Sequence, residues 1–576
     1  MSRKNRFAIA IVFKKKICNF PFVICHLKLK EVVSRRFSSM TNEKLQMENY
    51  KSFLKTLIIA IVMIAALSIP FLRGDARSTP PREAHALWAH PPDVGKSDET
   101  VRRFVEQCQR ANIDTIVILV KGMSGEVYWQ SRKFPRSVVN GYESFDMLGA
   151  LVREAHARNI KVDAWLCDFV EGANGVAYRE HPEWAQLNPD GKTTASETLG
   201  VQRRPYPYVW MCPARRPGYT DQWLLPMIEE IAENYAVDSI HHDYVRYPGD
   251  VAPDSYCFCD YCVKHIPRFA MLGYETRSEE RYRVAPVQER IEANWWSDPT
   301  MIPANWQERD RREMADYLLN GRTIPGGPPD LRYFFYNYRV HQIDTFVREA
   351  WERVTRINQR KGSRIGISAA VFKNPIQSGR FIGQQWDEWA PWISVFMPMT
   401  YRSHFAGGFD AYLDHLAETT ARQMEWIGQA KPLYAGIAST YLFREEWQPV
   451  DEMRDRLNEL KVMKTGDTAG RAEKAKAIKT AYQAVRLHLA KVAPDREREL
   501  GQRIEAINAG EPAQIDDLLK LFAQLRNDPP SGYLPAEKLE RSIEAARKAK
   551  PDGIAIFAAG SLTREKLWPA LEAAFR

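Results

Sequence analysis

One short segment of the chain concentrates residue types that can do chemistry. His241–Cys262 reads HHDYVRYPGDVAPDSYCFCDYC. Asp243 follows two histidines and lies three residues before Arg246, and a C-x-C-x-x-C cluster comes soon after. A carboxyl group beside a cation suits proton transfer or ligand binding, whereas clustered cysteines suit a metal ion or disulfide bonds. The position of this segment in the fold decides between these uses.

Eight short apolar runs alternate with amphipathic stretches after residue 84. The runs are apolar without long polar alternation, which indicates strands buried on both faces. Eight such strand–helix steps predict a (β/α)₈ barrel. An open doubly wound sheet is the alternative, but the sequence has no Gly-rich dinucleotide turn. The runs are Ala86–His90, Asp114–Gly122, Lys161–Phe169, Ser239–Tyr247, Arg364–Phe372, Ile393–Tyr401, Pro432–Thr440 and Gly553–Ser561.

Two insertions interrupt the predicted barrel, which spans residues 84–576. The first, residues 249–330, follows the fourth strand and contains the cysteine cluster. The second, residues 448–552, lies between the seventh and eighth strands and reads as charged amphipathic helices. We expect its charged faces to be solvated rather than to bind nucleic acid.

The N-terminal region accounts for the net positive charge of the chain. Residues 1–55 hold 13 Lys and Arg against 3 Asp and Glu, while the remainder holds 68 against 69. The near-neutral body gives no basic footprint for nucleic acid. Residues 47–76 contain the apolar run Thr56–Leu72 after lysines, which predicts a secretory signal or, alternatively, a membrane anchor. Residues 1–46 then read as a mis-called N-terminal extension, with Met47 as the start, and the protein is expected to be exported.

Candidate site residues were sought where the predicted strands end, because active sites of (β/α)₈ barrels lie at the carboxyl ends of their strands. Asp243 is the first candidate for a catalytic acid, although it could instead cap a loop or pair with Arg246. Asp168 could be a second catalytic carboxylate or a structural partner. Tyr401 could stabilise developing charge. The predicted substrate-binding residues are His90, Glu126, His242, Arg246 and His404, with at most one of His241 and His242 reaching the site.

Acids, histidines, tyrosines and an arginine at one barrel mouth suit the cleavage of glycosidic bonds. That reaction needs a proton donor and either a second carboxylate or a group of the substrate itself. The sequence contains no G-x-S-x-G elbow, no P-loop and no H-E-x-x-H motif. We therefore expect no organic cofactor and a carbohydrate as the partner.

Three segments resemble the glycosyl-hydrolase-like 10 domain family, exported bacterial (β/α)₈ proteins to which glycosidase activity is ascribed. They are ALWAH, AHARNIKVDAWL and VDSIHHDYVRYP. The resemblance covers residues 84–445 and the last predicted strand. It implies a carbohydrate-active barrel with Asp243 in its site. Some members of this family act on the glycan strands of peptidoglycan.

The cysteine cluster is similar to the zinc site of family 42 β-galactosidases, in which four cysteines bind one zinc ion near the barrel mouth. The matching residues here are Cys212, Cys257, Cys259 and Cys262. Four thiolates without a vacant position make a structural zinc site. A disulfide network is the alternative in an exported protein, although Cys257 and Cys259 are too close in sequence to pair with each other comfortably.

The sequence departs from those β-galactosidases at the catalytic positions. They carry glutamates after strands four and seven, whereas this chain has Asp243 after strand four and Glu445 and Glu446 several residues beyond strand seven. The run MPMTY is similar to the M-x-Y strand of chitinase-like barrels, in which the acetamido group of the substrate is the nucleophile. The sequence thus predicts an exported glycoside hydrolase that acts on a poly- or oligosaccharide, and the M-x-Y likeness adds the hypothesis of an N-acetylated glycan such as peptidoglycan strands. The alternative is a catalytically inactive carbohydrate-binding barrel.

Overall fold

The protein is described by a computed structural model, which covers residues 82–199, 204–251, 255–266, 311–320, 331–428, 431–464, 466–507 and 512–576. The predicted signal or anchor (47–76), the extension before it and much of the 249–330 insertion lie outside these residues. Among the described residues, no helix combines the length and apolar character needed to cross a membrane.

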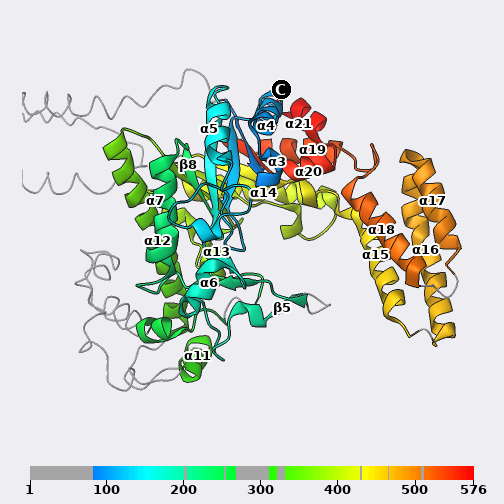
Figure 1. The fold of residues 1–576 in the computed structure, drawn as a ribbon, viewed down its shortest axis with the longest axis horizontal. Coiled ribbons are helices and arrows are strands. Elements are labelled where there is room, and N and C mark those ends of the chain that lie inside the picture. Colours follow the sequence, from blue (N-terminus) through cyan, green and yellow to red (C-terminus); the bar gives the residue numbers. More distant parts are fainter. Residues whose placement is uncertain are drawn as a thin grey trace, which may run out of the picture. The chain divides into compact units, whose positions relative to one another are not determined.

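Eight parallel strands form a closed barrel (Figure 1). Their order in the sheet is β10-β9-β8-β3-β2-β1-β12-β11, and parallel bridges from Phe396 to Leu433 and from Met399 to Gly436 join β10 to β11. Barrel strands that are consecutive along the chain are therefore neighbours all the way round, which confirms the predicted (β/α)₈ fold. The strands are β1 (Ala84–Ala89), β2 (Thr115–Lys121), β3 (Lys161–Cys167), β8 (Ser239–Asp243), β9 (Gly366–Val371), β10 (Val395–Pro398), β11 (Tyr434–Ala438) and β12 (Gly553–Phe557).

The strands are buried on both faces, as their apolar sequences predict. All seven residues of β2, TIVILVK, are buried. One face contacts the barrel interior and the other contacts the surrounding helices. Those helices are α4 (Asp98–Arg110), α5 (Met147–His156), α7 (Leu225–Asn234), α12 (Leu331–Lys361), α13 (Pro375–Ile382), α14 (Phe409–Ile427), α19 (Glu537–Arg547), α20 (Ala559–Arg564) and α21 (Trp568–Ala574).

Local sequence signals set where several helices begin and end. Ser97 caps α4 by accepting a hydrogen bond from the backbone N–H of Thr100. Asn374 caps α13 in the same way, and Pro375 occupies its first position. Helix α13 ends at Gly383, whose φ of 72° is the left-handed conformation that glycine adopts without strain. These caps fix the loops that connect the strand ends to the helices.

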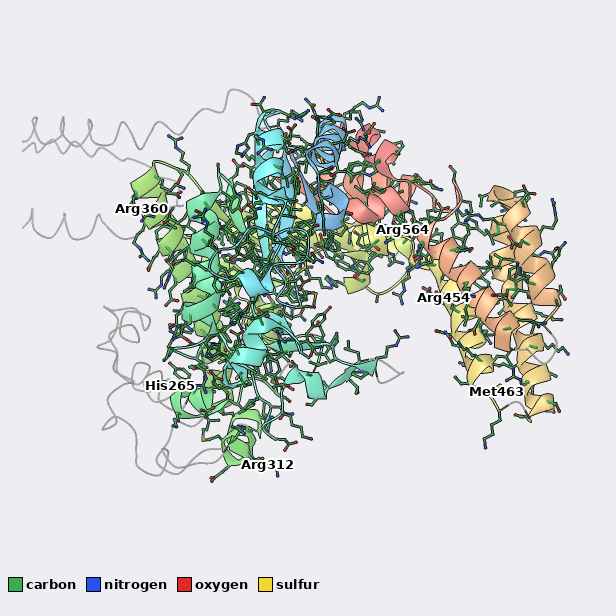
Figure 2. The ribbon with its side chains drawn as sticks, in the orientation of Figure 1. His265, Arg312, Arg360, Arg454, Met463 and Arg564 are labelled. Atoms are coloured by element: carbon green, nitrogen blue, oxygen red, sulfur yellow. The ribbon has the colours of Figure 1, made fainter. Side chains whose placement is uncertain are left out.

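Four helices form the insertion between the seventh and eighth barrel strands: α15 (Arg444–Val462), α16 (Thr468–Val492), α17 (Pro494–Glu505) and α18 (Pro512–Asn527). They pack against one another (Figure 1). In Figure 2, Arg454 marks the middle of α15 and Met463 its end. Helix α19 instead packs on α14 and α21. It therefore belongs to the barrel, and the helical insertion ends near Asn527 rather than at residue 552.

Candidate active site

A cavity of about 480 Å³ opens at the carboxyl ends of the strands. Each of the eight barrel strands contributes a residue from its end or from the loop directly after it, which is the position expected for the active site of this fold. The lining residues are Trp88, His90, Leu119, Met123, Ser124, Glu126, Trp165, Cys167, Tyr208, Asp243, Tyr244, Arg246, Asp250, Ala370, Phe372, Met399, Tyr401, Ser403, His404, Tyr441 and Phe557.

Asp243 is the buried carboxyl group of this cavity. It is the last residue of β8 and is 9% exposed. The backbone N–H of Tyr244 donates to its Oδ1 at 2.7 Å. Burial raises the pKa of Asp243 to about 6, against the opposing effects of that hydrogen bond and of the Arg246 charge. A carboxyl group with this pKa keeps a proton in weakly acidic solution, as a general acid must.

Arg246 is held in the cavity wall by aromatic rings. Its guanidinium carbon lies 4.8 Å from the ring centroids of Trp210 and Tyr244 and 5.0 Å from that of Phe372. Its Nη1 donates to the backbone oxygen of Tyr247 at 3.2 Å. Three stacked rings fix a planar cation in one orientation. The Arg246 charge is therefore positioned both for Asp243 and for a ligand.

Tyr401 and His404 line the same cavity from the loop after β10. Burial, followed by the Asp243 charge, raises the pKa of Tyr401 well above its usual value, so its hydroxyl stays protonated and can donate a hydrogen bond. The Nδ1–H of His404 donates to the backbone oxygen of Met399 at 2.8 Å. Burial lowers the pKa of His404, so the ring is neutral at pH 7 and its Nε2 can accept a hydrogen bond.

Glu126 brings a second carboxyl group to the cavity from the loop after β2. Its Oε1 lies 3.5 Å from the Tyr128 hydroxyl, and its buried Oε2 has no hydrogen-bond partner among the described residues. An unsatisfied buried carboxylate oxygen is costly unless a ligand supplies the partner. His90, after β1, also lines the cavity, with its ring edge-on to Trp165 at 5.3 Å.

Asp168 and His242 lie behind the cavity and do not line it. His242 Nδ1 is 2.8 Å from Asp168 Oδ2, and both side chains are fully buried. The His242 ring contacts Phe346 of α12 at 5.3 Å. Asp168 is therefore not placed to act as a second catalytic carboxylate, and His242 is not placed to contact a substrate. The placement agrees with the alternative prediction, in which Asp168 is a structural partner. The cause is strand geometry, because successive side chains point to opposite faces.

His241 points into the barrel but lies beneath the cavity. Its Nε2 accepts the indole N–H of Trp88 at 3.3 Å, and its Nδ1 lies 2.9 Å from Ser368 Oγ. Ser368 donates in turn to Asp163 Oδ2 at 2.8 Å. Burial lowers the pKa of His241 to about 3. This hydrogen-bonded chain fixes Trp88 in the cavity lining.

The cavity also has an aromatic lining that the analysis of strand ends missed, contributed by Trp88, Trp165, Phe372 and Phe557. Trp88 lies two residues before His90, and Trp165 lies two residues before Cys167. A two-residue step returns a side chain to the same face of a strand. Reading each strand backwards in steps of two from its end would have found both tryptophans.

No seventh-strand glutamate lines the cavity in the described part of the chain. Glu445 pairs with Arg402 and with Lys538, and Glu446 lies 2.8 Å from Lys538. Both carboxylates thus take part in ion pairs beside the helical insertion. The catalytic arrangement of the family 42 β-galactosidases is not reproduced here.

The four cysteines of the predicted metal site come together in the fold. Their Sγ atoms all lie within 4.8 Å of one another, and all four residues are buried. Cys212 Sγ is 3.6 Å from that of Cys262 and 3.7 Å from that of Cys259. None of the cysteines in the described residues forms a disulfide bond. Tetrahedral zinc–sulfur bonds of about 2.3 Å separate sulfurs by about 3.8 Å, so the donor set fits zinc.

Comparison with known proteins places the middle of the chain near glycosyl hydrolases. Residues 100–244 match the family described as hypothetical glycosyl hydrolase 6. Glycosyl hydrolase YngK of Bacillus subtilis is 22% identical over an alignment of 227 residues, which covers 35% of this chain and 40% of the Bacillus protein. The matched family is not the glycosyl-hydrolase-like 10 family that the sequence resembles, so that resemblance stays a prediction.

Solved structures of carbohydrate-active proteins are similar in fold. The glycoside hydrolase domain of PgaB (BpsB) from Bordetella bronchiseptica has a TM-score of 0.45 at 11% identity, covering 86% of this chain and 99% of that one. A β-galactosidase from Rahnella sp. R3 has a TM-score of 0.39 at 14% identity, covering 63% of this chain and 45% of that one. Similarity at this level says nothing about the site, and the barrel assignment rests on strand order.

Proposed function

We propose that the protein is an exported glycoside hydrolase that cuts a poly- or oligosaccharide, with N-acetylated glycans such as peptidoglycan strands as the substrate class. The observation that carries this proposal is Asp243, a buried carboxyl group of raised pKa in an aromatic-lined cavity at the strand ends. The aromatic side chains that line the cavity offer apolar surface against which a sugar ring can pack. The glycosyl hydrolase match over residues 100–244, which includes Asp243, supports the same reaction.

In the proposed mechanism, Asp243 donates its proton to the leaving glycosidic oxygen as the bond to the sugar carbon breaks. Positive charge then develops on the sugar ring, and a water molecule adds to the charged carbon and gives up a proton, which completes the hydrolysis. Arg246, stacked on its three rings, binds sugar hydroxyls beside Asp243. The Tyr401 hydroxyl and His404 Nε2 offer a donor and an acceptor on the side of the cavity formed by β10.

Two groups can serve as the second catalytic group that the reaction needs besides Asp243. One is the carboxylate of Glu126, whose buried Oε2 has no partner in the described structure. The other is the acetamido oxygen of an N-acetylated substrate, with the Tyr401 hydroxyl hydrogen-bonded to it. Loss of hydrolysis in Glu126→Gln would support the carboxylate. Full activity of that variant, together with no cleavage of de-N-acetylated glycans, would support the acetamido group.

The proposed function is tested by incubating the chain from residue 77 with N-acetylated and neutral glycans, including amidase-stripped peptidoglycan strands. Products are identified by mass spectrometry. We expect cleavage that disappears in Asp243→Asn and persists in Asp495→Asn, a matched change at a carboxylate that is 91% exposed on α17. Glycan binding without cleavage by the wild-type chain would instead favour the inactive carbohydrate-binding barrel.

We further propose that Cys212, Cys257, Cys259 and Cys262 bind one structural zinc ion. The support is the sulfur geometry and the complete burial of four thiols whose polar contacts are mainly with one another. The ion would tie Cys212, before α7, to the segment after β8.

Metal analysis tests this site without measuring activity. The wild-type chain is expected to retain about one zinc per chain after exhaustive dialysis. Cys257→Ser is expected to lose it and to unfold at lower temperature, because the segment is no longer tied down. Cys108→Ser, a buried cysteine outside the cluster, is the matched control and should keep its zinc. Disulfide-linked peptides between the four cysteines would contradict the proposal.

Export is the remaining part of the proposal, and it is supported by the apolar run Thr56–Leu72 after a basic stretch. Cell fractionation and N-terminal sequencing of the native protein test it. A mature chain that begins shortly after Leu72 would support a cleaved signal. Recovery of the full-length chain in the membrane fraction would support an anchor instead.

A further inference from the structure

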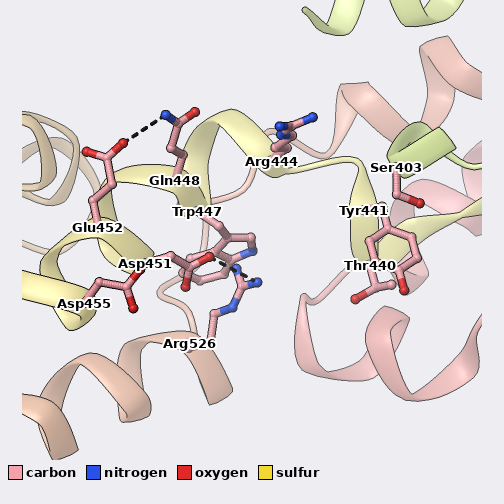
Figure 3. A pocket seen from close by; sticks show the side chains of 10 residues that line it. All are labelled: Ser403, Thr440, Tyr441, Arg444, Trp447, Gln448, Asp451, Glu452, Asp455 and Arg526. Carbon is pink, nitrogen blue, oxygen red and sulfur yellow. Dashed lines mark hydrogen bonds and ion pairs between the residues drawn. The ribbon is translucent and has the colours of Figure 1, made fainter. Parts of the chain in front are cut away.

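A second hollow, of about 620 Å³, lies where the barrel mouth meets the helical insertion (Figure 3). One side is formed by residues after β10 and β11, and the other by α15 with Arg526 of α18. The lining residues are Ser403, Thr440, Tyr441, Arg444, Trp447, Gln448, Asp451, Glu452, Asp455 and Arg526.

The second hollow adjoins the catalytic cavity. Ser403 and Tyr441 line both spaces. The Tyr441 ring is 44% exposed, and its centroid lies 6.3 Å from that of Tyr401, next to Asp243 in the cavity. A chain of sugars that leaves the catalytic cavity on this side therefore passes over an aromatic face.

The side chains that face the second hollow suit sugar hydroxyls. Gln448 Nε2 donates to Glu452 Oε1 at 2.9 Å, and both side chains remain exposed, as does Asp455. Three acids and two arginines line the hollow, so neither sign of charge dominates. A lining with both positive and negative hydrogen-bonding groups favours a neutral polyhydroxylated ligand over a polyanion.

The α15 wall of the second hollow follows the loop after β11 and packs against α18. Helix α15 begins three residues after Tyr441, with one face buried through Trp447. The Arg526 guanidinium lies 4.3 Å above the Trp447 ring and 3.8 Å from Asp451. From Arg444 to Asp455, α15 extends about 17 Å at its rise of about 1.5 Å per residue. The wall is thus preformed along several turns of helix.

We propose that the second hollow is a glycan-binding subsite continuous with the catalytic cavity. The protein then binds a sugar chain that runs from Asp243 across Tyr441 to the α15 helix of the insertion. This inference rests on the proposed glycosidase function and adds that the substrate is a chain of several units rather than a mono- or disaccharide.

The test measures binding of a short and a long glycan to the chain in which Asp243→Asn prevents cleavage. The probes are the dimer and hexamer of N-acetylglucosamine and of glucose, titrated by calorimetry. The variant Gln448→Ala/Asp455→Ala removes polar groups that line only the second hollow. The matched control Asp495→Ala/Gln502→Ala makes the same changes at exposed positions of α17, which line neither space.

The hexamer is expected to bind more tightly than the dimer. The Gln448→Ala/Asp455→Ala variant should raise the hexamer Kd roughly ten-fold through lost hydrogen bonds, with little change for the dimer and none for either glycan in the control. Equal Kd values for the two lengths, or equal effects of the variant on both, would overturn the second subsite while leaving the catalytic cavity in place. If neither length binds, the proposed function fails together with this inference.

Discussion

Two buried aspartates at neighbouring strand ends have different surroundings. Asp168 follows β3 and Asp243 ends β8, and the backbone N–H of Asp168 donates to the backbone oxygen of Asp243 at 2.8 Å. The Asp168 carboxylate has a histidine partner at 2.8 Å and is closed off from the cavity. The Asp243 carboxyl group accepts one backbone N–H and faces the cavity.

The comparison shows that burial alone does not identify a catalytic acid. Burial raises the pKa of both residues. At Asp168 the hydrogen bond with His242 satisfies the carboxyl group within the protein, which makes the pair a structural element. At Asp243 the carboxyl group keeps an open side, so a substrate can take its proton. The difference follows from strand alternation, which turns Asp243 inward and Asp168 outward.

The largest expected effect is on catalysis at Asp243. Asp243→Asn should lower kcat by about 10²- to 10⁴-fold, because the proton donor to the leaving group is lost. Steady-state kinetics on a cleaved glycan measure the effect. Asp168→Asn, the same change at the neighbouring acid, should alter kcat by less than about ten-fold. A reversal of these two results would exchange the roles assigned to the two residues.

Asp243 should also make stability depend on pH. Its folded pKa of about 6 lies above its usual value of 3.8, so its contribution to stability is fully present below pH 3.8 and is lost as the pH rises to about 6. The free energy of unfolding of Asp243→Asn relative to wild type should therefore increase by up to about 3 kcal/mol between pH 4 and pH 7. Denaturant unfolding at both pH values checks this, with Asp495→Asn as the control. A pH-independent difference would contradict the raised pKa.

A smaller effect on stability is expected at the Asp168–His242 pair. Asp168→Asn replaces a charged acceptor by a neutral one at a fully buried contact. The free energy of unfolding should fall by about 1–3 kcal/mol. Chemical denaturation measures the loss, and the cycle with His242→Asn isolates the pair energy. Additive effects of the two changes on the free energy of unfolding would show that Asp168 and His242 do not stabilise the fold through their contact.

The smallest predicted effect concerns Arg246. Its positive charge lowers the pKa of Asp243, so Arg246→Gln should raise that pKa by up to about one unit. The descending limb of the pH profile of kcat/KM should then move to higher pH. Arg246→Lys keeps the charge and should leave the limb in place, even if KM rises because the contacts with three rings are lost. An unmoved limb in Arg246→Gln would mean that this charge does not act on Asp243.

The barrel could be predicted because its strands are buried on both faces. Such strands read as uninterrupted apolar runs. Seven of the eight predicted runs contain a strand of the barrel, and the first overlaps β1. The rule that active sites lie at strand ends also predicted five residues that line one cavity in the structure: Asp243, Arg246, Glu126, Tyr401 and His404. The limit of the helical insertion was harder to place, because α18 and α19 are both amphipathic and differ only in what they pack against.

The site could not be fully predicted because position at a strand end does not determine where a side chain points. Asp168 and His242 have the right residue types in the right loops, yet the register that pairs Cys167 with Asp243 turns both of them away. The contribution of α15 to the second hollow depends on the angle at which the insertion leaves the barrel. Sequence periodicity carries no information about that angle.

The pH dependence of kcat/KM for the wild-type chain and Asp168→Asn tests the central claim most directly, namely that Asp243 is the ionising acid of the site and Asp168 is not. We predict that both proteins lose activity as the pH rises through about 6, because both keep Asp243. Asp168→Asn removes a charge that raises the pKa of Asp243, so this limb should persist and move only slightly to lower pH. A wild-type profile without the limb, or an Asp168→Asn profile that has lost it, would contradict the claim.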